Sequence, residues 1–442
     1  MKLFQQMLVA GATLSLLAPV AAQASDAVNL EEINSYSRSK TRLSRLDNKT
    51  FINDVNEEIV NLNGRVDGLE AMQNNLEAGA FSSTTTMDGK AVMWIGAVDG
   101  GDTIGDTEVT ETGYVYSMNL NTTFTGDDNL YIRLKAGDVG GAPSGSPAVD
   151  PSIWDNPSTY HIETKDTDDA FKVDKIWYTG TVGENLTYFV GPRIENYYMY
   201  ITPSIYQPGA LKSFKLGGNA NFGASTDVGF GFKWEAENGF GFASNVVSKD
   251  SDKAAGMLGK NDTNKWDTQI AYTADNWHVS ATMSNQQNWT SHAYNATKQA
   301  ATEMKTGDFT GYALRGYWRP EDSGTAVPEI SVGYDTRSAD DDTTVASGKG
   351  KDSDSYFVGF TWKDMFQEDD RIGIAFTQPL AVTECNGTCG TDEVDPFIWE
   401  AYYAFKPNDS IEVRPAIFGG SDVYEDTTDD IFGAVLTTTF KF

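Results

Sequence analysis

The sequence predicts an all-β fold, a sixteen-stranded antiparallel transmembrane β-barrel over residues 84–442, with a short N-terminal α-helical coiled-coil stalk before it. Three observations support this prediction. Apolar residues alternate with polar ones in segments of about ten residues, the length at which a tilted strand crosses a bilayer. Short turns and long polar loops alternate between these segments. The composition combines 23 Phe, 20 Tyr and 10 Trp with 42 Gly, which is unusual for a soluble enzyme.

The charge balance and the cysteine count limit what the chain can bind. The sequence has 33 Lys and Arg against 63 Asp and Glu, a formal net charge of −30. Nucleic-acid binding needs concentrated positive charge, so we expect no nucleic-acid partner. Two cysteines are too few for a disulfide-rich scaffold or a four-thiolate metal site.

Residues 1–24 are predicted to be an export signal. Lys2 precedes an apolar stretch from Met7 to Val20, and Ala22-Gln23-Ala24 gives the small-x-small pattern of a cleavage site. This stretch is shorter than the roughly 20 residues of a spanning helix. The signal therefore predicts the periplasm, the outer membrane or the medium as the destination. Residues 25–49 are polar and lack a sustained period, so we interpret them as a linker.

Residues 50–79 are predicted to form the periplasmic coiled-coil helix. Apolar residues recur there at alternating steps of three and four, which is a heptad seam. The alternative is a single amphipathic helix packed against the main domain, and the two glycines Gly64 and Gly68 weaken the helix in either case. The two core positions of the seam are Ile52, Ile59, Val66 and Gln73, and Val55, Leu62, Leu69 and Leu76.

From residue 84 onward the alternation separates an outer face from an inner one. The clearest case is Phe230, Phe232 and Trp234, which alternate with Gly231 and Lys233. A charge on a lipid face would cost about 2–4 kcal/mol at the midplane, so charged residues are expected to face water with or without a function. The charged residues predicted to line the lumen are Arg133, Lys135, Lys233, Arg315, Arg319, Arg371, Arg414, Glu235, Glu400 and Glu412.

The spacing of turns and loops predicts the strand number. Counting residues 216–224 as a strand gives seventeen and breaks the short–long alternation; placing them in the third long loop restores it and gives sixteen. Sixteen strands leave an aqueous channel. The third loop, near 193–226, is then long enough to fold back into the lumen. Arg193 and Glu195 begin this loop and are predicted to form the constriction, with anchoring of the loop to the wall as the alternative.

The last strand carries a strong local pattern. Phe432, Ala434, Leu436, Phe440 and Phe442 share one face of an alternating segment that ends the chain on an aromatic residue. Such an ending closes a barrel, because the final carboxylate lies at the aqueous interface. We therefore predict Phe440 and Phe442 as the membrane-insertion signal.

The long loops collect acidic residues, notably Asp340–Asp342, the 425–430 segment and the 166–169 segment. Such runs are usually solvated surface, although they would also suit divalent cations that bridge lipopolysaccharide. Their field favours cations at the mouth, whereas a basic lumen favours anions, so the sequence leaves the sign of ion selectivity open. No run has the spacing of a calcium loop, and we predict no metal site and no cofactor.

The remaining reactive residues predict a disulfide and no enzyme. Cys385 and Cys389 flank a three-residue segment of one long loop, where a disulfide would stiffen the loop of an exported protein. A hydrolase needs Ser, His and an acid brought together. The three histidines are His161, His278 and His292, and the adjacency of Ser291 to His292 does not make a catalytic pair.

Several short motifs follow one another along the chain: Met1-Lys2-Leu3-Phe4-Gln5-Gln6, Gly64 to Ala71, Phe81-Ser82-Ser83-Thr84-Thr85-Thr86, Gly191-Pro192, the Tyr-rich segment Asn196 to Tyr206, and Phe440-Lys441-Phe442. Taken in this order, they resemble the cyanobacterial outer-membrane porins of the carbohydrate-selective porin family. The resemblance spans most of the chain. The family usually has a surface-layer-homology module between signal and helix, and residues 25–49 occupy that place here.

The resemblance implies a homotrimeric porin in the outer membrane of a Gram-negative, cyanobacterial cell, with its stalk in the periplasm. Its partners would be outer-membrane lipid, lipopolysaccharide, the barrel-assembly machinery and small hydrophilic solutes. These solutes, inorganic ions and carbohydrates among them, would diffuse passively through the barrel. The alternative is a structural protein that links the membrane to the cell wall through the stalk.

Overall fold

The computed structural model describes residues 84–442 apart from 101–109, 140–160, 202–203, 218–225, 290–296, 298–299, 301–303, 305, 322–326, 342, 390–395 and 423–429. The predicted signal, linker and coiled-coil helix, residues 1–79, lie outside the described residues. Among the residues that are described, no helix is long and apolar enough to cross a membrane.

Sixteen long strands and the two-residue strand β4 form one sheet in the described part of the chain. Most of the long strands are 10 to 15 residues in length. They are β1 (Thr85–Asp99), β2 (Thr110–Thr122), β3 (Asn129–Val139), β4 (Lys165–Asp166), β5 (Lys172–Val182), β6 (Leu186–Glu195), β7 (Thr226–Glu235), β8 (Phe240–Ser248), β9 (Asn264–Thr273), β10 (Trp277–Gln287), β11 (Asp308–Trp318), β12 (Glu329–Ala339), β13 (Gly350–Lys363), β14 (Arg371–Cys385), β15 (Phe397–Asn408), β16 (Ile411–Ser421) and β17 (Ile431–Lys441).

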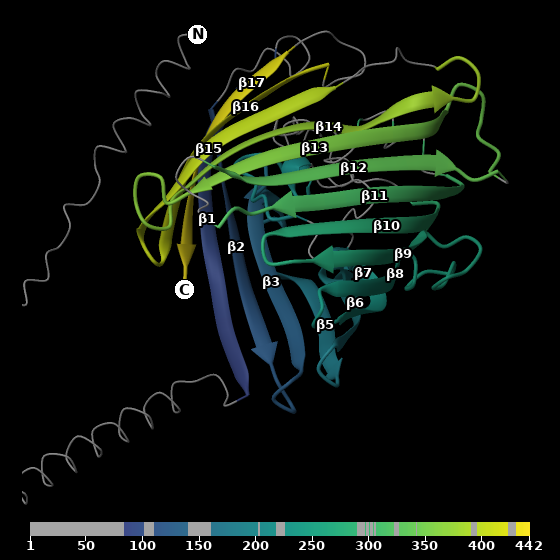
Figure 1. Ribbon diagram of the computed structural model, residues 1–442, viewed down its shortest axis with the longest axis horizontal. Helices are drawn as coiled ribbons and strands as arrows, with labels where there is room; N and C mark the ends of the chain where they lie inside the picture. Colours follow the sequence, from purple (N-terminus) through teal and green to yellow (C-terminus); the bar gives the residue numbers. More distant parts are fainter. Residues whose placement is uncertain are drawn as a thin grey trace, which may run out of the picture. The chain divides into compact units, whose positions relative to one another are not determined.

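The sheet closes into a barrel because its first and last strands pair with each other. β1 and β17 are antiparallel, with Lys90 opposite Lys441 and Asp99 opposite Phe432. Each other long strand pairs antiparallel with its neighbours in sequence, and β3 pairs with β5 alongside the short β4. Figure 1 shows the sheet curving from the dark strands β1–β3 through the green strands β10–β14 to the yellow strands β15–β17. The predicted sixteen-stranded antiparallel barrel is confirmed.

Short turns join the strands at one end of the barrel and longer connections join them at the other, as the sequence predicts. Two of the short turns are closed by the same arrangement. Asp128 accepts hydrogen bonds from the backbone N–H groups of Phe124 and Thr125, both at 2.8 Å, and from the hydroxyl of Tyr178 at 2.9 Å. Asp370 does the same in the β13–β14 turn, where the hydroxyl of Tyr403 donates to it at 2.9 Å.

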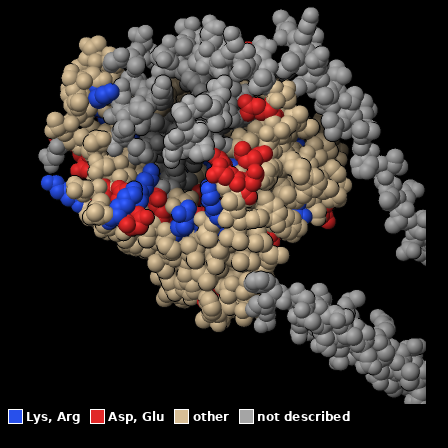
Figure 2. All heavy atoms as spheres, turned by 180° about the vertical axis from the view of Figure 1, so that it is seen from behind, with Lys and Arg blue, Asp and Glu red and all other residues tan. Residues whose placement is uncertain are grey.

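The outer surface of the barrel is apolar. Ile270 and Leu314, in the middle of β9 and β11, expose 62% and 56% of their surface. Burying such area is favourable only against hydrocarbon or another apolar surface. Figure 2 shows charged side chains gathered in a band on one face, beside a wide surface with few charges. Near the short turns, a row of outward aromatic residues follows the barrel rim, as expected at a membrane interface: Trp234, Phe240, Tyr272, Trp277 and Trp318.

The end of the chain completes the closure of the barrel. The backbone of Phe442 exchanges hydrogen bonds of 2.9 and 3.1 Å with Gly89 at the start of β1. Its ring stacks on Tyr116 of β2, with 5.6 Å between the centroids. Phe440 and Phe442 both keep exposed outer surface. Their position fits the predicted outward face of the last strand; their role as an insertion signal stays a prediction.

Candidate functional site

The long loop between β6 and β7 spans residues 196–225, and we call it L3; its described residues, 196–201 and 204–217, lie inside the barrel. It begins with the short helix η3 (Asn196–Met199), and Tyr200 and Ile201 after it are buried. The hydroxyl of Tyr200 donates to the carboxylate of Asp267, and the N–H of Ile201 donates to Oε1 of Gln269 at 2.8 Å. Asp267 and Gln269 lie on the inner face of β9, opposite the exposed face. L3 therefore starts along the inner wall.

One carboxylate on β15 anchors the middle of L3. Glu400 is fully buried, and its two oxygens accept the backbone N–H groups of Gly209, Ala210 and Leu211 at 2.8 to 3.0 Å. The hydroxyl of Tyr206 donates to the same carboxylate at 2.8 Å. Glu400 was predicted to line the lumen. It does point inward, but L3 covers it, so the structure makes it an attachment point for the loop.

A second loop segment, residues 161–167, joins L3 inside the barrel. The N–H of Ile162 donates to the carbonyl of Ala210 at 2.7 Å, and His161 forms a β-bridge with Leu211. The fully buried ring of His161 lies 5.0 Å from that of Trp94 on β1. Burial, and to a lesser extent the nearby Arg414, lower the pKa of His161 to about 3. The imidazole is therefore neutral at physiological pH.

L3 and the 161–167 segment bring a group of cations together, and we call it the basic cluster. Three ion pairs lie within it. Glu163 pairs with Lys90 at 2.6 Å, Asp174 pairs with Lys165 at 3.2 Å, and Glu195 at the end of β6 forms a buried pair with Lys175. The cluster has seven cationic side chains against the three carboxylates Glu163, Asp174 and Glu195. Its cations are Lys90, Arg133, Lys135, Lys165, Lys175, Lys212 and Lys215.

The cations of this cluster repel one another. Burial lowers the pKa of Lys212, and Lys135 and Lys215 lower it further. Burial also lowers the pKa of Lys215. For Glu163, burial acts to raise the pKa, but Lys90 and Lys135 outweigh it and lower the pKa to about 2. A negative charge is thus strongly stabilised here, although the chain as a whole is acidic.

Arg193 and Glu195, the predicted constriction residues, hold the start of L3 against β5. The carboxylate of Glu195 pairs with Lys175 and accepts the hydroxyl of Tyr197. Nε of Arg193 lies 3.4 Å from the backbone carbonyl of Asp174. Glu195 thus belongs to the basic cluster and anchors the loop as well.

Most of the other charged residues predicted to line the lumen form ion pairs on the inner wall. Arg315 is 3% exposed and forms an ion pair with Asp335, so little of its surface is accessible from the lumen. Arg133 and Lys135 belong to the basic cluster. The remaining pairs are Lys233 with Glu235 at 3.1 Å, Arg319 with Glu329 at 2.7 Å, Arg371 with Glu412 at 3.1 Å, and Arg414 with Glu412 at 3.4 Å.

Sequence reasoning missed five of the seven cations. Lys175 could not be assigned to the inner face from the sequence. The pairing of β3 with β5 shifts register between Arg133 and Leu134, and this shift interrupts the alternation of inner and outer residues near Asp174. Lys212 and Lys215 lie in L3, and Lys165 lies in the strand β4, where no period of two marks an inner face. Lys90 could have been found, because it alternates with the outward Ala91 and Met93 on β1.

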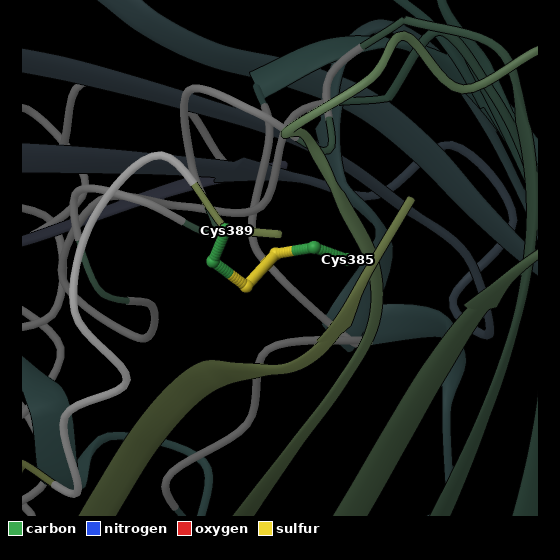
Figure 3. Close-up of a disulfide and its surroundings, with 2 residues drawn as sticks. All are labelled: Cys385 and Cys389. Carbon is green, nitrogen blue, oxygen red and sulfur yellow. A yellow bond between two sulfur atoms is a disulfide. The ribbon is translucent and has the colours of Figure 1, made fainter. Parts of the chain in front are cut away.

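Cys385 and Cys389 form a disulfide at the end of β14 (Figure 3), with 5.4 Å between their Cα atoms. The described residues contain no group of His, Cys, Asp and Glu that could hold a metal ion. Of the acidic runs, the described Asp166 and Asp169 serve local contacts: the hydroxyl of Tyr114 donates to Asp169 at 2.5 Å, and the N–H of Asp168 donates to Asp166 at 3.0 Å.

The chain is similar in sequence to two cyanobacterial proteins and in fold to bacterial porins. No family model matches it. It is 25% identical to an uncharacterised protein of Nostoc sp. over 431 residues, covering 87% of this chain and 70% of the relative. It is 24% identical to an uncharacterised protein of Synechocystis sp. over 411 residues, covering 84% of this chain and 71% of the relative.

Solved structures that it resembles include bacterial outer-membrane porins. OprB of Pseudomonas putida aligns with a TM-score of 0.55 at 11% identity, over 85% of this chain and 97% of that one. OmpF of Salmonella typhi aligns with a TM-score of 0.51 at 12% identity, over 81% of this chain and 97% of that one. At such identities the likeness shows the fold.

Proposed function

We propose that this chain is an outer-membrane porin through which small hydrophilic solutes diffuse passively. One observation carries the proposal: the barrel has an apolar outer surface and an interior in which a folded-in loop meets charged walls. An apolar exterior suits lipid, and a charged, loop-restricted interior suits a water-filled channel that selects by size and charge. The mechanism needs no catalytic group, metal or cofactor.

The basic cluster gives the proposed pore a preference for anions. Seven basic side chains and three carboxylates lie where L3 and the 161–167 segment meet the walls of β1, β3 and β5; of the seven, Lys175 is buried in its pair with Glu195. A permeating anion relieves the repulsion among these cations, whereas a cation adds to it. Inorganic anions and small uncharged solutes, carbohydrates included, are the solutes that such a passage admits.

The proposal also covers the setting of the barrel. The predicted export signal at 1–24 supports delivery to the outer membrane, where the partners would be lipid, lipopolysaccharide and the barrel-assembly machinery. The predicted coiled coil at 50–79 supports a periplasmic stalk, and the resemblance to the cyanobacterial porins supports a homotrimer. The same heptad seam supports the alternative, a structural link from the membrane to the cell wall.

Reconstitution in planar bilayers separates the two functions. A porin produces discrete current steps in salt solution and makes liposomes swell in small sugars, with swelling that falls as the sugar grows. A purely structural link inserts into the bilayer and conducts nothing. Insertion without current would therefore refute the porin proposal.

A further inference from the structure

A cavity of about 250 Å³ lies between L3 and the short-turn ends of β11 to β14. Residues 204–207 of L3 form one side of it, and Arg319, Glu329, Thr361 and Lys363 form the other together with Arg371. None of these residues belongs to the basic cluster, which is built on β1, β3 and β5. The L3 side is held by Glu400, through the hydroxyl of Tyr206, so the cavity has a fixed wall.

Two cations of the cavity share one oxygen of one carboxylate. Nε of Arg319 and Nζ of Lys363 lie 2.7 and 2.8 Å from the same Oε1 of Glu329. Glu329 is 2% exposed, whereas the side chains of Arg319 and Lys363 keep 45% and 36% of their surface accessible. The Glu329 carboxylate is thus buried and paired at the base of the cavity, whereas Arg319 and Lys363 remain accessible to a ligand.

Arg371, the third cation of the cavity, also shares a single carboxylate with another cation. Arg371 shares Glu412 with Arg414, at 3.1 and 3.4 Å. Nε of Arg371, and Nε and Nη2 of Arg414, are buried N–H donors without a hydrogen-bond partner among the described residues. Leaving such donors unsatisfied is costly, more so for charged groups. Four cations thus face the carboxylates of Glu329 and Glu412, while the nearby Glu400 is occupied by the N–H groups of L3 and the hydroxyl of Tyr206. This part of the interior keeps an excess of positive charge.

The lining fits a small oxyanion better than a sugar. Arginine presents a fork of N–H donors that matches two oxygens of one anion, and Lys363 adds a point charge. The side chains of Ser204 and Thr361 add neutral hydroxyls. Tyr206 is the aromatic residue among those that line the cavity, and its hydroxyl is committed to Glu400, so no broad stacking platform for a sugar ring is present.

We propose that this cavity is a binding site for a small multivalent oxyanion of the phosphate or sulfate class. The site lies between L3 and the short-turn end of the barrel and would hold the anion beside the path through the pore. Its role in permeation rests on the proposed porin function, whereas the binding itself does not.

The test uses the whole chain refolded in detergent, with inorganic phosphate as the probe. In planar bilayers carrying chloride current, phosphate is expected to reduce the current in a saturable way. Lys363→Gln is expected to raise the half-blocking concentration about tenfold, because it removes one charge from the ligand side. The variant should fold, since Arg319 still pairs with Glu329. Lys351→Gln is the matched control, because Lys351 lies on the same strand in an exposed pair with Glu384.

Calorimetric titration of the same samples with phosphate gives a second measurement that needs no conductance. Saturable binding weakened by Lys363→Gln and unchanged by Lys351→Gln supports the site, even if the protein proves not to conduct. Equal phosphate binding in all three proteins, or none, overturns it. Binding of maltose in place of phosphate, with the same dependence on Lys363, would show a sugar site and overturn it too.

Discussion

Glu400 determines the path of a loop far from it in sequence. It is separated by 191 residues from Gly209, yet its carboxylate accepts three consecutive N–H groups of L3. A carboxylate can accept all of them at once because it has two oxygens and several lone pairs. No neutral side chain of the same size has this capacity. We therefore expect the position of L3 to depend on the charge state and identity of this one residue.

Substituting Glu400 with glutamine tests this dependence. The amide has one acceptor oxygen, so at least one buried N–H group of L3 loses its partner, at a cost of about 1–3 kcal/mol. We expect larger and noisier single-channel conductance, because L3 leaves the wall of β15 for part of the time. Glu384→Gln, at the exposed end of β14, is the control. Identical conductance and noise in the two variants would contradict the anchoring role.

His161 predicts a pH dependence of stability. The pKa of His161 is lowered from 6.5 to about 3 in the folded protein, so between these values the unfolded chain binds more protons. Its contribution to stability is present above pH 6.5 and is lost as the pH falls. At about pH 5 the loss amounts to about 2 kcal/mol.

The measurement is the thermal unfolding temperature in detergent between about pH 7 and about pH 5. It should fall with decreasing pH in the natural protein and fall less in His161→Gln. Glu163 does not interfere: its pKa is lowered from 4.5 to about 2, so its contribution is lost only as the pH falls below 4.5. Parallel curves for the two proteins would show that His161 is not held neutral.

At the scale of elements, the short turns carry their own stabilising contacts. In the β2–β3 turn, Asp128 accepts two backbone N–H groups and the hydroxyls of Thr123 and Tyr178. The last of these ties the turn to the next strand, β5. The β13–β14 turn repeats the arrangement with Asp370 and Tyr403. Both turns therefore set the register of three strands at the short-turn end of the barrel.

Asp128→Asn is expected to lower the unfolding temperature of the barrel. One carboxylate oxygen of Asp128 is replaced by an amide NH₂ group, which is a donor and would face the donors that now bind the carboxylate. Asp127→Asn, at the exposed neighbouring position, is the control and should have little effect. Heat-induced loss of the folded form in detergent measures both. If both variants unfold at the same temperature as the natural protein, the hydrogen bonds to the Asp128 carboxylate do not stabilise the turn.

At the scale of the whole molecule, the period of two and the spacing of the turns determine how much of the fold could be predicted from the sequence. The period of two gives the strands and their outer faces, because the lipid side must be apolar at alternate residues, as in Phe230 and Phe232. The spacing of turns gives the strand number. L3 has no period, so its anchoring on Glu400 and its contribution of Lys212 and Lys215 could not be read from the sequence. These contacts arise only when the closed barrel brings β15, β1 and L3 together.

Ion selectivity tests the central claim most directly, that the basic cluster controls passage through the barrel. In a potassium chloride gradient across a planar bilayer, the reversal potential of the natural chain should show a preference for chloride. Replacing Lys212 and Lys215 with glutamine should shift it toward potassium, whereas Lys253→Gln, in an exposed loop pair with Asp250, should leave it unchanged. A preference for potassium that the double substitution does not alter would contradict the account.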